Sequence, residues 1–448
     1  MKKFCLLSGL LLTMMFVFAA CGNDNDQPAG TGDGLNGGNP ATIRFAWWGA
    51  DARHEALLEA IRIFEDRYPH ITVEPEFGAF AGYLDSLTVQ LAGQDEADVL
   101  QSNYAWIHSL GGGTNVFANL RDFAHIIDLT EWSDDLLQFT TTADGQLGGV
   151  SHGITGRVII YNTELLAEHG FSTFPATFDE LATLGESISA GNATLDAGSN
   201  TYAFFPVGNE SWDIIMLTML YNETGRNLQA NGQILHTVDE VEQMFDVWQR
   251  LLDSGALPTF EQQEIPLDTT NPVWMQGRGG ALFEWVGNIF LAAGNFIDND
   301  PPNRVVEGLG VALLPSITPG GSRNSMQRPS LVHTISRNSS HPEVAAYFLN
   351  FLYTDEEALM AIGPQFGVPL SRTAAQIAER EGQVWGLMAE GLELLTANVG
   401  EMCPLFEDMN LRSHRFHAIE AFRTGAASAH EAAELWVNNQ QLALNDMN

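Results

Sequence analysis

Lysine is almost missing from this sequence of 448 residues. Lys2 and Lys3 account for two of the 20 Lys+Arg residues, and the remaining 18 are all arginines. Several kinds of catalytic and phosphate-binding site need a lysine amine in the folded part of the chain. The sequence therefore excludes a Walker A phosphate loop, a pyridoxal Schiff base, a protein-kinase strand lysine and a Ser-x-x-Lys nucleophile pair.

Positive charge in general is scarce, with 20 Lys+Arg against 56 Asp+Glu and a formal net charge of −36. A surface this acidic repels phosphate backbones and anionic lipid head groups. The charge therefore disfavours binding of nucleic acid, or of a membrane through a basic patch. The hydrophobic content of 45% indicates a globular chain, and the length favours two domains.

Cysteine is equally rare, since the sequence holds three, which is too few for a disulfide framework in an exported chain. Residues 1–20 carry two lysines and an apolar stretch too short to span a bilayer, as in a secretory signal peptide. The segment FAAC ending at Cys21 resembles a bacterial lipoprotein signal, which predicts lipidation of Cys21. The alternative is an ordinary cleavage site beside an incidental cysteine. Residues 21–40, rich in Gly, Asn and Asp, predict a flexible tether.

Apolar residues predict a βαβ unit at the start of the folded chain. They alternate over residues 43–47, recur at helical spacing over 51–68 and alternate again over 71–77. A helix crossover of this kind joins strands that run parallel. A second helix over 83–91 and a third strand at 99–100 are expected to extend the same sheet.

Tryptophans follow two of these predicted strands. Trp48 comes just after the first strand, and Trp106 comes just after the third. Ligands bind beyond the carboxyl ends of strands in open α/β sheets, and aromatic faces suit the C–H faces of sugar rings. Trp48 and Trp106 are therefore candidates for a sugar site. Trp47, which alternates with Phe45, and Trp248, which lies on one apolar helix face, are expected to pack in the core.

Several sequence blocks occur in a fixed order between about residue 41 and about residue 375. They include FAWWGADARHEALLEAIRIFEDRYPHITVEPEFG, DGQLGGVSHGITGRVIIYN, GRGGALFEWVGN and PSLVHTISRNSSHPEVAAYFLNFLYTDEEAL. In order and spacing these blocks resemble the family 1 extracellular solute-binding lipoproteins of bacterial ABC sugar importers. Two departures are Ser151, where the family usually has proline, and the replacement of the usual lysines in the first helix.

The resemblance implies an α/β fold of two lobes, a periplasmic-binding-protein-like fold of type II, with a hinge and a ligand cleft at the interface. Lobe 1 would take residues 41–157 and 317–370, and lobe 2 residues 158–316 and 371–448. The implied function is that of a lipid-anchored substrate-binding component, which binds a carbohydrate, expected to be an oligosaccharide, and delivers it to the transmembrane subunits of a permease. The expected location is the extracytoplasmic face of the cell membrane, as a monomer without cofactor or metal.

In such a cleft, we expect rings at strand or helix ends to stack on sugars and polar side chains to bond their hydroxyls. The expected ligand-binding residues are Trp48, Asp51, Asn103, Tyr104, Trp106, Trp212, Trp285, Asn288 and Arg328. Arg157 and Arg328 are the arginines expected nearest the cleft, where paired guanidinium groups would suit a uronate carboxylate. They would equally brace the hinge or bond neutral hydroxyls, so the choice between a neutral and an acidic sugar stays open.

Catalytic motifs are incomplete. Residues 149–153 fit the pattern G-x-S-x-G, but the residues that follow are strand-like, whereas a nucleophile elbow needs a helix there. His54-Glu55 begins a zinc-protease motif that Leu58 breaks, and the C-terminal histidines bind metal only if separate segments converge. We therefore expect no enzyme. A surface lipoprotein glycoside hydrolase or polysaccharide lyase remains the alternative, because a spatial pair of carboxylates is not visible in a sequence.

Overall fold

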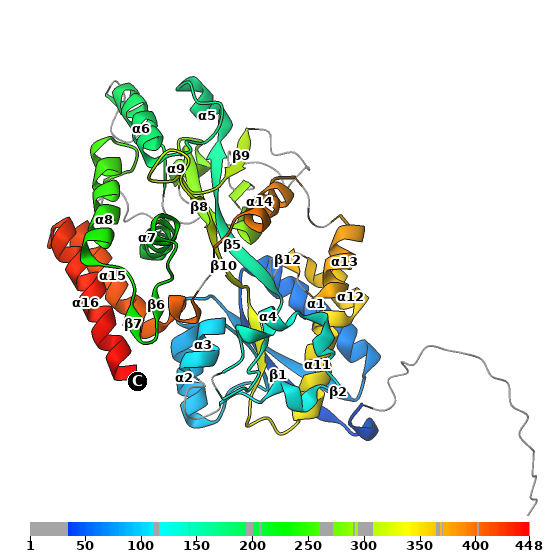
Figure 1. Ribbon diagram of the computed structural model, residues 1–448. Coiled ribbons are helices and arrows are strands. Elements are labelled where there is room, and N and C mark those ends of the chain that lie inside the picture. Colours follow the sequence, from blue (N-terminus) through cyan, green and yellow to red (C-terminus); the bar gives the residue numbers. More distant parts are fainter. Residues whose placement is uncertain are drawn as a thin grey trace, which may run out of the picture.

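The computed structural model has two α/β lobes (Figure 1). It describes residues 35–110, 116–142, 144–193, 200–205, 208–259, 272–289, 292–293, 308–363, 368–369, 371–382, 384, 386–400 and 403–447. The expected signal peptide, Cys21 and most of the expected tether lie outside these residues. Within the described ranges, none of the helices combines the length and apolar character that a membrane span needs.

The first lobe is built on a five-stranded sheet with the order β2-β1-β3-β11-β4. β1 pairs parallel with β2 and β3, which confirms the βαβ unit, while β11 runs antiparallel to β3 and β4. The elements are η1 (Leu35–Gly38), β1 (Ala41–Trp48), α1 (Asp51–Arg67), β2 (Ile71–Gly78), α2 (Tyr83–Gly93), β3 (Val99–Ser102), α3 (Tyr104–Ser109), η2 (Leu120–Phe123), η3 (Leu129–Glu131), α4 (Asp134–Gln138), β4 (Val150–Ser151), β11 (Val332–Ile335), α11 (Pro342–Thr354) and α12 (Glu356–Ile362).

The core of this lobe lies between β1 and the helices α1 and α11. Phe45 and Trp47 alternate inward along β1 and are fully buried, as the spacing predicts. The Phe45 ring lies 5.3 Å from Phe348 of α11, and Phe64 of α1 lies 5.0 Å from the same ring. This packing fixes the end of β1, where Trp48 follows.

The second lobe is built around the long strand β5 (Gly153–Asn162), in the sheet order β12-β5-β10-β13 with β8 and β9 paired to β5. Its strands are β6 (Gln229–Ala230), β7 (Gln233–Ile234), β8 (Ala281–Trp285), β9 (Leu309–Ala312), β10 (Ser325–Pro329), β12 (Val368–Pro369) and β13 (Val399–Gly400). Its helices are α5 (Thr163–Glu168), α6 (Phe178–Asn192), α7 (Gly208–Thr224), α8 (Val238–Asp253), α9 (Pro272–Met275), η6 (Val286–Asn288), α14 (Gly386–Ala397), η8 (Pro404–Glu407), α15 (Met409–Arg423) and α16 (Ala429–Met447).

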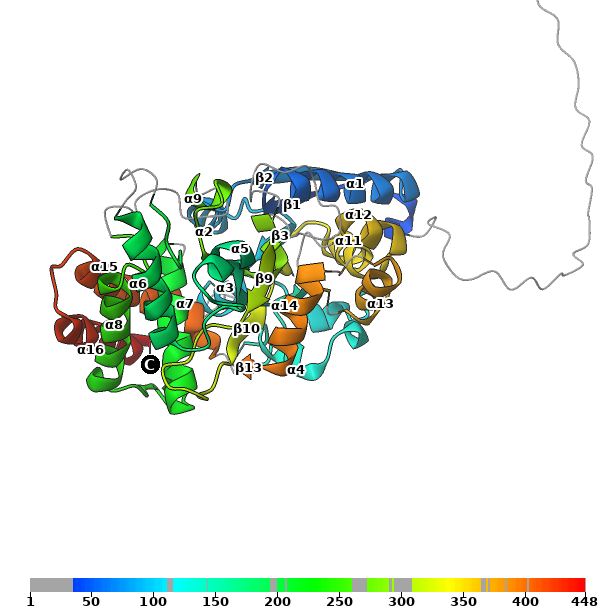
Figure 2. The same ribbon diagram turned by 90° about the horizontal axis from the view of Figure 1, so that it is seen from above.

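Strands β5 and β10 run from one lobe to the other (Figure 1). The first residues of β5 pair with β12 and β10, and its later residues pair with β8 and β9. Shortly after β10 the chain enters β11 of the first sheet. Between these two strands, the amide of Ser330 donates to the carbonyl of Gly153 at 2.6 Å. Seen from above, helices α8, α15 and α16 lie at one end of the molecule and α1, α11 and α12 at the other (Figure 2).

Helix α13 (Arg372–Arg380) packs against α11 and α12 of the first lobe. The backbone amide of Thr373 also donates to Glu131 of that lobe at 2.7 Å. Our predicted division assigned this helix to the second lobe, because it follows residue 370. We propose that α13 belongs to the first lobe instead, although β12, the short strand just before it, pairs with β5.

Candidate functional site

A pocket with about 310 Å³ of free space lies between the two lobes. Its volume falls at the lower end of the range for small-molecule sites, which is about 300–1,000 Å³. Both lobes contribute side chains to its lining. Further lining residues come from β5 and β10, which cross between the lobes, and from the chain around η8 and α15. The lining residues are Trp48, Arg53, Phe80, Ser102, Asn103, Thr155, Glu210, Trp285, Gly287, Asn288, Arg328, Ser330, Leu331, Glu407 and Arg412.

Five of the nine predicted ligand-binding residues line this pocket, namely Trp48, Asn103, Trp285, Asn288 and Arg328. Trp48 ends β1 and Asn103 follows β3, so the parallel pairing of these strands brings both residues to one edge of the sheet. Trp285 ends β8 of the other lobe, and Asn288 ends the short helix η6. These four residues were selected because they lie at the ends of strands or helices, and the structure brings them to one pocket.

The other four predicted residues do not line the pocket. Asp51 is exposed as the first residue of α1, outside the pocket lining. Tyr104 and Trp106, in the first turn of α3, are buried in the core, with exposed fractions of 0% and 3%. Trp212 on α7 is also buried.

Helix α7 begins at the pocket, but it presents Glu210 there instead of Trp212. Residues two apart on an α-helix point to nearly opposite sides, whereas residues three apart share a face. Trp212 accordingly faces α8 and stacks on Trp248, with ring centroids 3.5 Å apart. Glu210 and Asp213 share the other face, which is turned toward a group of arginines.

Aromatic rings gather around Trp48. The centroids of Tyr83, Trp106 and Phe80 lie 4.9, 5.4 and 5.6 Å from that of Trp48. Trp106 thus supports Trp48 from the core without reaching the pocket. Phe80 lines the pocket and is 57% exposed, which leaves apolar ring surface open to a ligand.

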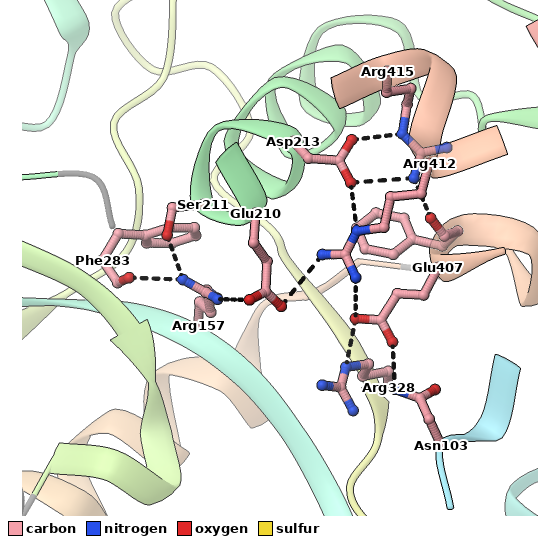
Figure 3. A network of polar contacts seen from close by, with 11 residues as sticks. Asn103, Arg157, Glu210, Ser211, Asp213, Phe283, Arg328, Glu407, Arg412 and Arg415 are labelled. Atoms are coloured by element: carbon pink, nitrogen blue, oxygen red, sulfur yellow. Dashed lines mark hydrogen bonds and ion pairs between the residues drawn. The ribbon is translucent and has the colours of Figure 1, made fainter. Parts of the chain in front are cut away.

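A chain of ion pairs runs along the pocket (Figure 3). At its centre, Arg412 lies 3.3 Å from Glu210, 3.3 Å from Asp213 and 3.9 Å from Glu407. Glu210 also pairs with Arg157 at 3.5 Å. Burial opposes the charge of Arg412, but these three carboxylates outweigh that effect and raise its pKa.

One branch of this chain joins the two lobes. Glu407 of η8 pairs with Arg328 at 3.1 Å and accepts a hydrogen bond of 3.1 Å from Nδ2 of Asn103 (Figure 3). The Oδ1 atom of Asn103 accepts from the amide of Ala105 and so caps α3. Asn103 is therefore held in place by its own lobe while it contacts the other.

Arg157 and Arg328 are both engaged within the protein. Arg157 donates to Ser211 Oγ at 2.6 Å and to the carbonyl of Phe283 at 3.1 Å. The guanidinium carbons of Arg157 and Arg328 lie 4.6 and 4.3 Å from the centroid of Trp285. Contacts within the protein therefore hold both guanidinium groups against Trp285.

Burial and charge act in opposite directions on the two carboxylates beside Arg157. Burial alone would raise the pKa of Glu210, but Arg157, Arg412 and Arg328 outweigh it and lower the pKa below its ordinary value. For Glu284 burial is the stronger effect and raises the pKa, against the opposing charge of Arg157. Glu210 is therefore ionised at neutral pH, so it accepts hydrogen bonds and does not supply a proton.

The sequence profile of the bacterial extracellular solute-binding protein family matches residues 46–359, which is well over half of the chain. The chain belongs to this family. The expected two-lobe α/β fold is also confirmed by solved periplasmic solute-binding proteins, which superpose on nearly the whole chain.

Three similar proteins show how far the likeness extends. The diacetylchitobiose-binding protein DasA of Streptomyces coelicolor is 26% identical over 43% of this solute-binding protein and 44% of its own length. A probable ABC transporter-binding protein of Deinococcus radiodurans is 23% identical over 50% and 57%. The chain thus spans about half the length of these curated relatives. A periplasmic oligogalacturonide-binding protein of Yersinia enterocolitica, solved with saturated digalacturonic acid, has a TM-score of 0.80 at 23% identity over 90% of this chain and 99% of that one.

The G-x-S-x-G segment of this solute-binding protein has no nucleophile-elbow geometry. Ser151 ends β4, and strand β5, not a helix, starts at Gly153. The Ser151 hydroxyl is buried and donates to the backbone, with carbonyl oxygens of Gly153 and Ser330 at 2.7 and 2.6 Å. Across the described residues, no group of three or more His, Cys, Asp or Glu side chains is arranged to hold a metal ion.

Several lining residues of this solute-binding protein were not predicted. Arg53 and Phe80 follow β1 and β2 within five residues, so the rule that selected Trp48 also applied to them. Glu407 and Arg412 carry no such signal. Glu407 reaches Asn103 across 304 positions of sequence, and only the tertiary packing of η8 on α3 brings it there.

Proposed function

We propose that this chain is the substrate-binding component of an ABC importer and that it binds a carbohydrate, expected to be an oligosaccharide, in the pocket between its lobes. The observation that carries the proposal is the composition of the pocket. The rings of Trp48, Phe80 and Trp285 share it with hydroxyl, amide and charged groups. Aromatic faces bind the C–H faces of sugars and polar groups bind the hydroxyls, so this mixture suits a sugar better than a wholly apolar ligand.

The position of the pocket supports binding by closure of the lobes. Trp48 and Asn103 come from one lobe, while Trp285 and Asn288 come from the other. A ligand that contacts both sides interacts more strongly with the closed form than with an open one, and so shifts the population toward closure. The bond between Asn103 and Glu407 would form in the same movement.

The names of similar proteins support the same ligand class and the transport role. One relative is described as binding diacetylchitobiose and one structural neighbour as binding oligogalacturonide, and another relative is described as a probable ABC transporter-binding protein. By this proposal the chain works as a monomer outside the cytoplasm and delivers its sugar to the permease. The lipidation of Cys21 would anchor it to the membrane.

A surface glycoside hydrolase or lyase is the alternative, because Glu210 and Glu407 both line the pocket. A glycosidase needs one carboxyl group that is protonated at working pH. Arginines lower the pKa of Glu210, and Glu407 is held in ion pairs with Arg328 and Arg412. The two carboxylates therefore fit binding better than acid–base catalysis.

A thermal-shift screen of oligosaccharides tests this function. We expect at least one sugar to raise the melting temperature, because binding at 100 times Kd stabilises a folded protein by about 2.7 kcal/mol. Mass spectrometry after prolonged incubation should recover that sugar unchanged. Shortened products would favour the hydrolase or lyase, and a broad panel without any stabilising sugar would contradict carbohydrate binding.

A further inference from the structure

Ser330 lies in the connection between the crossing strand β10 and strand β11. Its amide donates to the carbonyl of Gly153 at 2.6 Å, and its carbonyl accepts from the Ser151 hydroxyl at 2.6 Å. Its side chain is 5% exposed and lines the pocket. Two hydrogen bonds to its backbone therefore hold Ser330 in a fixed position at the pocket.

The hydroxyl group of Ser330 is not satisfied by the protein in the same way. Among the described residues, none forms a hydrogen bond with its Oγ atom. Leaving a buried hydroxyl without a partner is unfavourable, and a serine hydroxyl can both donate and accept a hydrogen bond. A group that enters the pocket, either water or part of a ligand, would supply the missing partner.

Ser330 faces the same side of the crossing strands as two other polar residues. In the pairing of β10 with β5, Arg328 lies opposite Thr155, and side chains along a strand alternate between two faces. Ser330 follows Arg328 by two positions and shares its face, and all three residues line the pocket. Pro329 and Ile154, which are paired on the other face, do not line it. A ligand that fills the pocket would thus contact the crossing strands as well as the two lobes.

Ser325, the first residue of β10, is an informative comparison. It is as deeply buried as Ser330, with an exposed fraction of 6% against 5%. The Ser325 hydroxyl, however, donates to the carbonyl of Arg157 at 3.0 Å, and Ser325 does not line the pocket. The protein therefore satisfies the buried hydroxyl that lies away from the pocket and leaves the one at the pocket for another partner.

We propose that the Ser330 hydroxyl binds a ring hydroxyl of the saccharide and selects sugars that carry a free hydroxyl at that position. This inference rests on the proposed function and adds a specificity-determining residue to it. A site built to hydrogen-bond one hydroxyl discriminates against an analogue without it, because the polar group of the site then stays unpaired. The fixed backbone of Ser330 keeps the position of the selected hydroxyl constant.

Two serine variants separate ligand binding from folding. Ser330→Ala should weaken sugar binding about 2- to 10-fold, as for one hydrogen bond between neutral groups, and should keep or raise the melting temperature. Ser325→Ala is the matched control, which should lower the melting temperature and leave affinity unchanged, because it removes a bond within the protein. The measurements are thermal unfolding and calorimetry with cellotriose, maltotriose, diacetylchitobiose and digalacturonate.

Two results with these variants would overturn the inference. One is an unchanged affinity of Ser330→Ala for every probe that the wild type binds, which would mean that the ligand does not use this hydroxyl. The other is a fall in melting temperature as large as that of Ser325→Ala, which would assign the hydroxyl to the fold.

Monodeoxy analogues of the bound probe then identify the sugar hydroxyl. One analogue should bind the wild type about 2- to 10-fold more weakly than the parent sugar and should show no further loss with Ser330→Ala, because both changes remove the same bond. Additive losses for every analogue would overturn this inference and leave the proposed function intact. Binding of no saccharide by the wild type would overturn the proposed function itself, and this inference with it.

Discussion

Replacing Asp213 by asparagine should lower the free energy of unfolding by about 3–5 kcal/mol, the cost of breaking a buried ion pair. Asp213 and Arg415 are both fully buried, and the Asp213 carboxylate accepts from Arg415 Nε at 2.5 Å and from Nη2 at 3.1 Å. Arg415 also donates to Gln440 Oε1 at 3.0 Å and to the carbonyl of Phe406. One guanidinium group thus joins α7, α15, α16 and η8, and the variant would leave the buried charge of Arg415 without the carboxylate that neutralises it.

Denaturant unfolding of two further variants checks the cause. Asp66→Asn is the matched control, since its pair with Arg62 is exposed and is expected to contribute about 1 kcal/mol at most. The double variant Asp213→Asn, Arg415→Met should recover part of the lost stability, because it removes the unpaired charge. A loss below about 1 kcal/mol for Asp213→Asn would contradict the role assigned to this network.

Trp248→Ala should also lower the free energy of unfolding by about 3–5 kcal/mol, because it opens a large cavity in the core of the second lobe. Trp248 is fully buried, with Trp212 stacked on it at 3.5 Å and Phe422 of α15 at 5.5 Å between centroids. The effect should fall on stability and leave ligand affinity nearly unchanged, since Trp248 does not line the pocket.

Phe80→Ala should give the opposite pattern to Trp248→Ala in the same assays, with stability retained and ligand affinity reduced. Phe80 is 57% exposed at the pocket, so its removal should change stability by about 0.5 kcal/mol or less and should weaken ligand binding. A Trp248→Ala protein with wild-type stability would show that the packing of α7 against α8 is not the core of this lobe.

The first three strands of the first lobe could be predicted from the sequence because local patterns determine them. Phe45 and Trp47 alternate along β1, the helical spacing of α1 follows, and a βαβ unit has one common handedness. The lobe assignment of α13 was not predictable in this way. Its position depends on contacts with α11 and α12 and with Glu131, none of which has a local sequence signal.

Site residues could be predicted from the sequence only where their position at the end of a strand determines which residues lie near them. This rule selected Trp48 and Trp285 for the pocket, but it also selected Trp106, which α3 turns into the core. The orientation of α7 depends on which face packs against α8, so α7 presents Glu210 to the pocket and buries Trp212, which the sequence suggested for the site. The charged network depends on the approach of distant segments and was invisible in the sequence.

The most direct test of carbohydrate binding between the lobes is calorimetry of Trp48→Ala and Asn288→Ala with the sugar that most stabilises the wild type. Trp48 belongs to one lobe and Asn288 to the other. We expect both folded variants to lose about 1–3 kcal/mol of binding free energy, as for other buried anchor residues. Wild-type affinity in both variants, or a loss in one of them alone, would contradict a ligand held between the lobes.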